Sequence, residues 1–380
     1  MPKTMKINLE KASTKMPLSK IILMVGASLA LSTQAYAAPA TGHHDNACVD
    51  EIAQEMGVSG MVLLANSDDI ILNNAYYLDS LPGDAHTTDT RFNVGSMHKM
   101  FTAVAIGQLV EQGKVDFDAS IRTYLPNLPE EYGPINVGHL LSHMSGVGNY
   151  FQPKNRPAIN AHESVDDLVV LVLAEPLAFD AGTQWQYSNS GFVLLGSIIE
   201  SVAGGSYYDY VEEYVFEAAG MTSSGHLPDD NTATPYSSMS RGRPGGPDAP
   251  LNPQALGRGM PAGGYFSTTM DLYRFAQALI NNQLVSAETK SILTSPKPGA
   301  IRTDRRTGAQ SFYGYGFGIT NDLSSFGHSG GGAGVSTDFK VWPETGTVMI
   351  TLFNLDPMLA DEFNARVMEA KMSDNKFTPC

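Results

Sequence analysis

Strand-like patterns occur near both ends of this 380-residue chain, and mainly helical patterns occupy its middle. Toward the N-terminus, residues 60–65 and 70–77 are rich in apolar and β-branched side chains and flank a Ser-Asp-Asp turn. Toward the C-terminus, residues 316–320, 337–341 and 347–353 have the same character. This order predicts an antiparallel sheet built from both chain ends, with helices inserted between them.

The helical patterns divide the chain further. They occupy residues 96–112, 165–173, 192–202, 207–218, 270–281 and 357–371. We therefore predict a sheet subdomain of about residues 48–113 and 263–380, a helical subdomain of about residues 114–262, and a cleft between the two. Residues 227–260 are dense in Pro, Gly, Asn and Asp, and loops of this length are usually functional lids or mobile segments.

A serine and a lysine lie three residues apart where an extended stretch runs into an apolar helix. They are Ser96 and Lys99, and positions three apart on a helix share a face, so the amine can reach the hydroxyl. A serine is a weak nucleophile until a neighbouring base takes its proton. A helix N-terminus also directs free backbone N–H groups at an oxyanion. Taken alone, the pair is explained better by a capping serine and a solvent-facing lysine, so its context must decide.

Two further motifs supply that context. Tyr187-Ser188-Asn189 precedes another apolar helix, and His328-Ser329-Gly330-Gly331 lies between strand-like segments near the C-terminus. With these three ordered motifs, the chain resembles the penicillin-binding and class C β-lactamase family of serine hydrolases over roughly residues 48–355. That family includes D-alanyl-D-alanine carboxypeptidases, β-lactamases and related esterases. The resemblance implies an α/β (α+β) fold of the β-lactamase/transpeptidase type, an antiparallel sheet flanked by helices with an inserted all-helical subdomain.

The resemblance also implies roles for individual residues. Ser96 is the expected nucleophile, and Lys99 and Tyr187 share the handling of its proton. Which of these two is the general base stays open at this stage. Asn189 is expected to orient Lys99 and to bind the substrate amide.

The last motif departs from the family's Lys-Thr-Gly pattern. His328 replaces the lysine, and a histidine offers a positive charge to a substrate carboxylate only when it is protonated. This change weakens the prediction of an efficient β-lactamase. Ser329 and Gly330 are expected to contact the substrate, Gly330 by close backbone approach. The backbone N–H groups of Ser96 and Gly331 are the expected oxyanion hole.

Two other patterns are less informative. Gly327–Gly331 matches the Gly-x-Ser-x-Gly elbow of α/β-hydrolases, but that elbow leads into a helix, and no histidine follows His328 to complete a triad. His139 and His143 are four apart, yet the glutamate of the zincin pattern is missing. We therefore predict neither a metal nor an organic cofactor.

The N-terminus has the features of a secretory signal. Lys15 and Lys20 flank a start-like Met16, and a short apolar run follows over residues 21–31. Ala35-Tyr36-Ala37 then offers a cleavage site after Ala37. The run is shorter than the roughly 20 residues that span a bilayer. We predict residues 1–37 as a signal peptide, residues 38–380 as the hydrolase domain, and a periplasmic or secreted protein without a stable membrane anchor after cleavage.

The charge of the chain bears on its partners. Residues 1–37 carry five lysines and one glutamate, so their removal lowers the formal net charge from −15 to −19. Such an acidic protein is repelled by nucleic acids and anionic membranes. We expect a small-molecule or peptide substrate instead, with peptidoglycan among the candidates.

The chain has two cysteines, Cys48 and Cys380, which export would place in a compartment where a disulfide between them persists.

The sequence therefore predicts a serine hydrolase that forms an acyl-Ser96 intermediate on D-alanyl peptides, small amides or esters. Two alternatives stay open. One is a non-catalytic penicillin-binding sensor or scaffold, which has no need for the complete set of Ser96, Lys99, Tyr187 and Asn189. The other is a carboxylesterase or acyltransferase of the same fold.

Overall fold

The computed structural model describes most of the chain beyond its first 45 residues. Residue contacts divide the chain into 1–38 and 39–380, and every described residue belongs to the second unit. The described residues are 46–67, 69–78, 80–81, 85–237, 249–303, 308–373 and 376–377. Within these residues, no helix combines the length and apolarity needed to cross a membrane.

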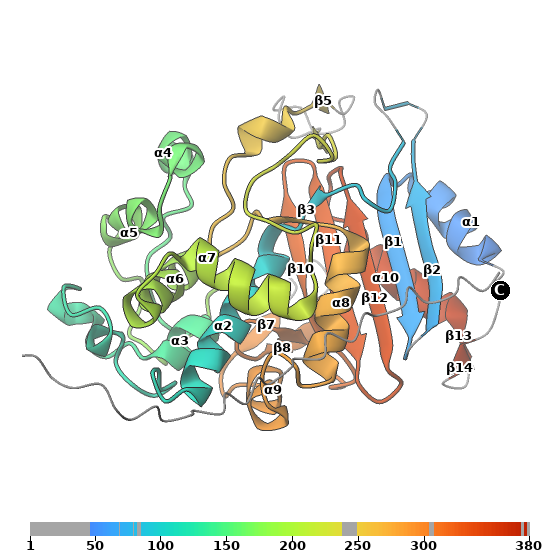
Figure 1. Ribbon diagram of the computed structural model, residues 1–380. Coiled ribbons are helices and arrows are strands. Elements are labelled where there is room, and N and C mark those ends of the chain that lie inside the picture. The colour runs from blue at the N-terminus through green and yellow to red at the C-terminus, as the bar shows by residue number, and fades with distance from the viewer. Residues whose placement is uncertain are drawn as a thin grey trace, which may run out of the picture. The chain divides into compact units, whose positions relative to one another are not determined.

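An eight-stranded sheet forms the centre of the second unit (Figure 1). Its strands, in spatial order, are β2 (Asp69–Tyr76), β1 (Gly60–Asn66), β12 (Thr347–Phe353), β11 (Val335–Trp342), β10 (Phe326–Gly332), β9 (Gly318–Ile319), β8 (Gln310–Tyr313) and β7 (Ile301–Thr303). Each neighbouring pair is antiparallel. The first and last long strands pair directly, with Gly60 opposite Phe353 and Asn66 opposite Thr347.

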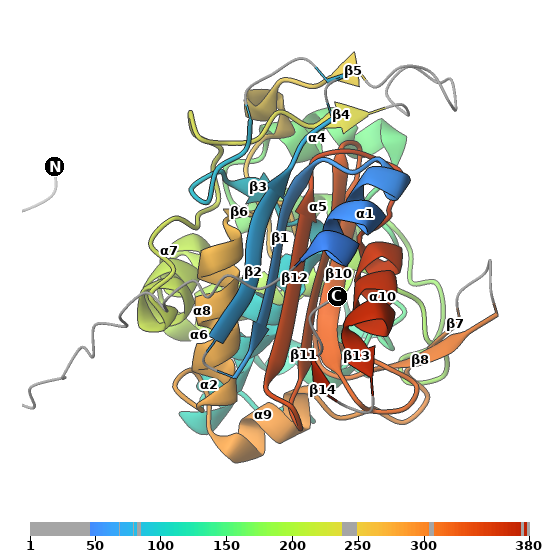
Figure 2. The same ribbon diagram turned by 90° about the vertical axis from the view of Figure 1, so that its right-hand side faces the viewer.

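Helices cover both faces of this sheet. Figure 2 shows α1 (Ala47–Met56) and α10 (Ala360–Lys371) on one face. Along β1, Val62 and Leu64 pack with these two helices, whereas Met61, Leu63 and Ala65 belong to the larger core on the other face. That core includes residues of α2 (Lys99–Glu111), α8 (Thr269–Ile280) and α9 (Ala287–Leu293). Both faces of β1 are therefore buried, which explains its unbroken apolar sequence.

The middle of the chain is helical. It contains α3 (Val137–Leu141), α4 (Arg156–Ala161), α5 (Val165–Leu173), α6 (Asn189–Ala203) and α7 (Tyr207–Val211), and α7 continues into a π-helical segment at Glu212–Glu217. Helix α2 packs against α6 and α7, and its side chains from Lys99 through Gly107 are all buried. An apolar helix that is buried on all sides has little freedom to shift, so it is a rigid base for the residues at its first turn.

The predicted antiparallel sheet flanked by helices is confirmed. The structure differs in detail at three places. The helix expected from residue 96 begins with a 3-10 turn, η1 (Gly95–His98), before α2. The His328 motif lies inside strand β10 rather than between strands. The segment 227–260, expected as a loop, carries β4 (Tyr236–Ser237), β5 (Ala249–Pro250) and a 3-10 turn at Pro253–Leu256.

Candidate active site

Ser96 lies in a tight turn between a short strand and the buried helix α2. Strand β3 (Phe92–Asn93) pairs with β6 (Phe266–Ser267), and the Asn93 side chain accepts a hydrogen bond from the Gly95 N–H at 2.9 Å. Gly95 has a φ of 54°, a conformation that favours glycine. A side chain there would also meet the backbone nitrogen of Gly331 at 3.0 Å. This turn therefore brings Ser96 beside strand β10.

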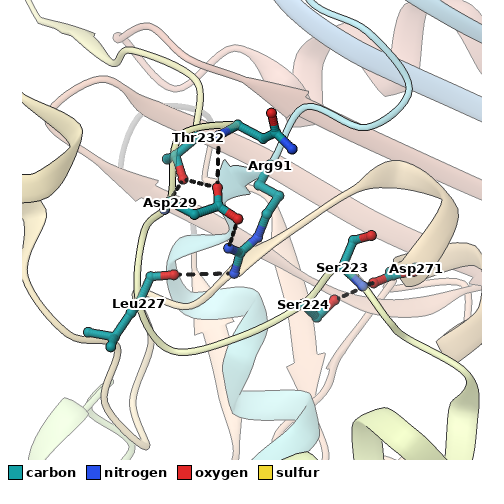
Figure 3. A network of polar contacts seen from close by, with 8 residues as sticks. Arg91, Ser223, Ser224, Leu227, Asp229, Thr232 and Asp271 are labelled. Carbon is teal, nitrogen blue, oxygen red and sulfur yellow. Dashed lines mark hydrogen bonds and ion pairs between the residues drawn. The ribbon is translucent and has the colours of Figure 1, made fainter.

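A buried arginine anchors the segment that enters this turn (Figure 3). The Arg91 guanidinium forms an ion pair with Asp229 at 2.5 Å and donates to the Leu227 carbonyl at 3.2 Å. The Arg91 N–H also donates to the Asn231 carbonyl. In the same region, the Asp271 carboxylate accepts hydrogen bonds from the Ser223 N–H and the Ser224 hydroxyl. These contacts hold residues 227–231 at the start of the 227–260 segment. Residues 238–248 lie outside the described residues, so the lid or mobile loop that the composition predicted stays a prediction.

Lys99 is buried at the first position of α2 and has three oxygen neighbours. Its Nζ lies 3.2 Å from Ser96 Oγ, 2.7 Å from Asn189 Oδ1 and 2.5 Å from the Ala262 carbonyl oxygen. The side chain is fully buried, and burial holds the pKa of Lys99 well below its ordinary value. None of the three neighbours is an anion that would stabilise the ammonium form.

The three contacts restrict where the protons of a neutral Lys99 lie. The Asn189 amide oxygen and the Ala262 carbonyl are acceptors only, so each receives an N–H. A neutral amine has two N–H groups, and both are then used. Its lone pair is left for the Ser96 hydroxyl, which is the arrangement of a nucleophile beside its base.

The ring of Tyr187 also lies next to the Lys99 amine. Lys99 Nζ is 4.8 Å from the centre of the Tyr187 ring. Burial of the hydroxyl raises the pKa of Tyr187, and a hydrogen bond with Ser96 offsets part of that rise. The residue as a whole keeps 38% of its surface exposed, so the desolvation acts on the hydroxyl end rather than on the whole ring. Tyr187 is a phenol at neutral pH and a proton donor.

The ring of His143 packs against the ring of Tyr187, a contact that the sequence did not predict. Its ring centre lies 4.3 Å from that of Tyr187, and its Nδ1 accepts a hydrogen bond from the Ser188 N–H at 3.1 Å. Burial and the nearby Lys99 hold the pKa of His143 well below its ordinary value, so the ring is neutral. Through the ring contact and the Ser188 hydrogen bond, His143 acts as a positioning residue for the Tyr187 loop.

Among the described residues, no group of three or more His, Cys, Asp or Glu side chains is arranged to hold a metal ion.

His328 is buried on β10 and has both ring nitrogens occupied. Nδ1 lies 2.6 Å from the Ser329 carbonyl, and Nε2 lies 2.8 Å from the Tyr313 hydroxyl. The carbonyl is an acceptor only, so Nδ1 carries the proton and Nε2 accepts from Tyr313. Burial, with a smaller effect of Lys99, lowers the pKa of His328 to about 3. His328 is neutral at physiological pH and brings no positive charge to this side of the site.

The two glycines after Ser329 allow strand β10 to lie close to η1, the turn that contains Ser96. A side chain on Gly330 would meet the Val94 carbonyl oxygen at 2.2 Å and Thr337 Oγ1 at 2.4 Å. Thr337 itself donates to that Val94 carbonyl at 3.0 Å. The Gly331 nitrogen thereby lies close to Gly95, the residue before Ser96, and the oxyanion hole of Ser96 and Gly331 stays a prediction.

A pocket of about 200 Å³ opens in front of Ser96. We call it the Ser96 pocket, and its lining includes Ser96, Asn189, Gly331, Met260, Arg156 and Arg258. Ser329 is not among the residues that line it. Ser329 instead lines a neighbouring cavity of about 170 Å³ with Arg302, Asp338 and Lys340. Neither arginine of the Ser96 pocket was predicted as a site residue.

The structure describes one of the two cysteines of the predicted disulfide. Cys48 is in α1 and packs against the small core beneath α1 and α10. Cys380 lies outside the described residues. The bridge therefore stays a prediction.

Known proteins share this sequence pattern and fold. The family model described as Beta-lactamase matches residues 46–371. The putative penicillin-binding protein PbpX of Bacillus subtilis (strain 168) is 28% identical over 299 residues, which cover 75% of this chain and 71% of that protein. The crystal structure of a penicillin-binding protein from Bacillus halodurans has a TM-score of 0.71 at 26% identity, over 87% of this chain and 98% of that one. A D-stereospecific amidohydrolase from Streptomyces sp. has a TM-score of 0.70 at 25% identity, over 86% and 98%.

Proposed function

The chain belongs to the Beta-lactamase family, whose fold includes serine hydrolases, and on that premise we propose that it hydrolyses D-alanyl peptides, small amides or esters through an acyl-Ser96 intermediate. The observation that carries the proposal is the environment of Lys99. A fully buried amine, 3.2 Å from Ser96 Oγ and without an anionic neighbour, is prepared to accept the serine proton.

The reaction proceeds in two halves. Ser96 Oγ forms a bond to the substrate carbonyl carbon while its proton passes to Lys99. The oxyanion is held between the N–H groups of Ser96 and Gly331. When the tetrahedral adduct collapses, the bond to the leaving amine or alcohol breaks, and a proton reaches that group through the Tyr187 hydroxyl. Water then attacks the acyl-Ser96 carbonyl carbon and gives a proton to Lys99. The bond between that carbon and Ser96 Oγ breaks, Lys99 returns the proton to Oγ, and the acid is released.

The substrate class rests on the relatives and on the motifs. Penicillin-binding proteins and a D-stereospecific amidohydrolase share this fold at 25–28% identity. A substrate with a D-configured residue at the scissile bond accords with both names. Slow acylation by penicillins is expected, because a β-lactam presents its carbonyl to the same hydroxyl.

The alternative function is a penicillin-binding sensor that acylates without turnover. A chromogenic ester separates the two, because an enzyme shows a burst followed by steady turnover, whereas a sensor stops after one equivalent. The contacts of Lys99 with Ser96, Asn189 and the Tyr187 ring bring the complete set together, which favours the enzyme.

Intact-mass spectrometry tests the proposal. The protein is incubated with penicillin, a D-Ala-D-Ala peptide and short esters, and acyl adducts are mapped. Ser96→Ala should abolish covalent labelling and ester turnover. Ser329→Ala is the matched control, since this serine lies in the neighbouring cavity, and it should still be labelled. An acyl group on Ser329 contradicts the mechanism.

Export is part of the proposal. Residues 1–37 have the lysines, the apolar run and the Ala-x-Ala site of a secretory signal. We expect a mature protein that begins at Ala38 in the periplasmic or secreted fraction. N-terminal mass analysis of each cell fraction checks this, and an uncleaved cytoplasmic protein contradicts it.

A further inference from the structure

Two arginines line the Ser96 pocket, although the chain carries a formal net charge of −15. Arg156 comes from the start of α4, and Arg258 comes from the segment after the Pro253–Leu256 turn. These two segments touch, since a side chain on Gly257 would meet the Asn160 carbonyl oxygen at 3.1 Å. Both arginines thus come from neighbouring segments and line the pocket that contains the nucleophile.

Each guanidinium is held on an aromatic ring. Arg156 lies 4.8 Å from the centre of the Phe151 ring, and Arg258 lies 5.1 Å from the centre of the Tyr208 ring. Stacking occupies the face of a guanidinium and leaves its N–H edge free for hydrogen bonds. Two arginine side chains held by stacking lose less conformational entropy on binding a ligand than two arginine side chains that rotate freely.

Neither arginine has an acidic partner within the described part of the chain. The ion pairs found there involve Arg91, Lys154, Arg274, Lys340 and Arg366 instead. Arginine forms bidentate hydrogen bonds with carboxylates, so two unpaired guanidiniums beside a nucleophile form a binding site for an anion. His328 is neutral and fully hydrogen-bonded, so it does not compete for that anion.

We propose that Arg156 and Arg258 bind a carboxylate of the substrate, so that the enzyme selects anionic acyl compounds over neutral ones. This inference rests on the proposed function for its catalytic consequence. The binding of the anion itself does not depend on hydrolysis. In an acidic protein, a local pair of cations also offsets the repulsion that an anionic substrate meets elsewhere on the surface.

Binding is tested first, without any turnover. Glutarate and the neutral glutaramide are titrated by calorimetry into the wild-type chain, the double variant Arg156→Gln/Arg258→Gln, and the control Arg366→Gln. Arg366 is a surface arginine of α10 that pairs with Glu55, so its loss removes one positive charge away from the pocket, whereas the double variant removes two within it. Glutarate should bind more tightly than glutaramide, and the double variant should lose about 10-fold or more of that affinity. Equal binding of the two compounds, or full glutarate binding by the double variant, overturns the proposal.

Turnover is tested second. The substrates are mono-p-nitrophenyl glutarate and p-nitrophenyl pentanoate, which differ in the terminal carboxylate. The double variant should lose about 10-fold or more in kcat/KM on the charged ester and keep its rate on the neutral ester, which also shows that it is folded. Equal losses on both esters overturn the proposal. If the wild-type chain binds glutarate through these arginines but hydrolyses neither ester, the proposed function fails and the anion site stands.

Discussion

Burial has opposite effects on the two proton-handling residues next to Ser96. Removing a charge from water disfavours the charged form, which is the cation for Lys99 and the phenolate for Tyr187. Burial therefore lowers the pKa of Lys99 and raises that of Tyr187. Both groups are driven toward their neutral forms. A neutral amine is a base and a neutral phenol is a proton donor, so we propose Lys99 as the base and Tyr187 as the donor, two roles that the sequence left open.

The first prediction is the pH dependence of acylation. Since only deprotonated Lys99 accepts the Ser96 proton, kcat/KM should rise with pH through the lowered pKa of Lys99, well below the range of an exposed lysine. Lys99→Arg keeps a permanent charge and should lose about 10²- to 10⁴-fold of activity. Tyr187→Phe should have a lower kcat/KM, but this kcat/KM should fall at low pH in the same way as that of the wild type. If the fall at low pH disappears in Tyr187→Phe, Tyr187 is the base.

The second prediction concerns acid stability at His328. The folded protein takes up this proton only near pH 3, whereas an unfolded histidine takes it up near pH 6.5. Between these values the unfolded state binds more protons, so the free energy of unfolding falls as the pH falls, by about 1.4 kcal/mol per pH unit from this group. Urea unfolding at pH 7, 5 and 4 should show a smaller decrease for His328→Gln than for the wild type. An identical decrease means that His328 is not the titrating group.

At the scale of elements, the proposed oxyanion hole depends on one contact between η1 and β10. The turn and the strand are more than 200 residues apart in the sequence. Backbone atoms of the two approach so closely at Gly95 and Gly330 that a methyl group would fill the gap. Thr337 of β11 fixes the turn from the neighbouring strand through the Val94 carbonyl.

The third prediction follows from that contact. Gly330→Ala introduces a methyl group 2.2 Å from the Val94 oxygen, so β10 must move away from η1. The Gly331 N–H moves with it, and loss of one oxyanion donor costs about 10²- to 10³-fold in rate. The matched control is Gly205→Ala, because a side chain at Gly205 meets nothing within 4 Å. Ester kinetics and thermal unfolding of both variants check this. A Gly330→Ala enzyme with normal kcat excludes strand β10 from the oxyanion hole.

The elements that sequence predicts well are those with a strong local pattern. Strand β12 at Thr347–Phe353 is an apolar run buried on both faces, and it has the predicted bounds. Strands β7 and β8 were missed because they are short, and the side chains of β7 are exposed.

In the site, the spacing of Ser96 and Lys99 is local and was predicted. Arg156 and Arg258 lie far apart in the sequence, and only the contact between their two segments brings them together.

At the scale of the whole molecule, the predicted Cys48–Cys380 disulfide would close a loop around nearly the entire described chain. Chain-entropy arguments give about 5 kcal/mol for so long a loop, as an upper bound. Non-reducing mass spectrometry of the exported protein should find two hydrogens fewer than the reduced form, and Cys48→Ser should unfold at a lower temperature. Two free thiols, or a dimer that reductant dissolves, contradict an intramolecular bridge.

The pairing of β1 with β12 has a consequence for the synthesis of the protein. Residues 60–66 leave the ribosome long before their partners at 347–353 are made. Until then β1 has only β2 beside it, and two strands alone are marginally stable in water. The nascent chain therefore cannot complete its central sheet before residues 347–353 have emerged. Pulse-chase proteolysis should find protection of residues 60–66 only in chains long enough to expose residues 347–353.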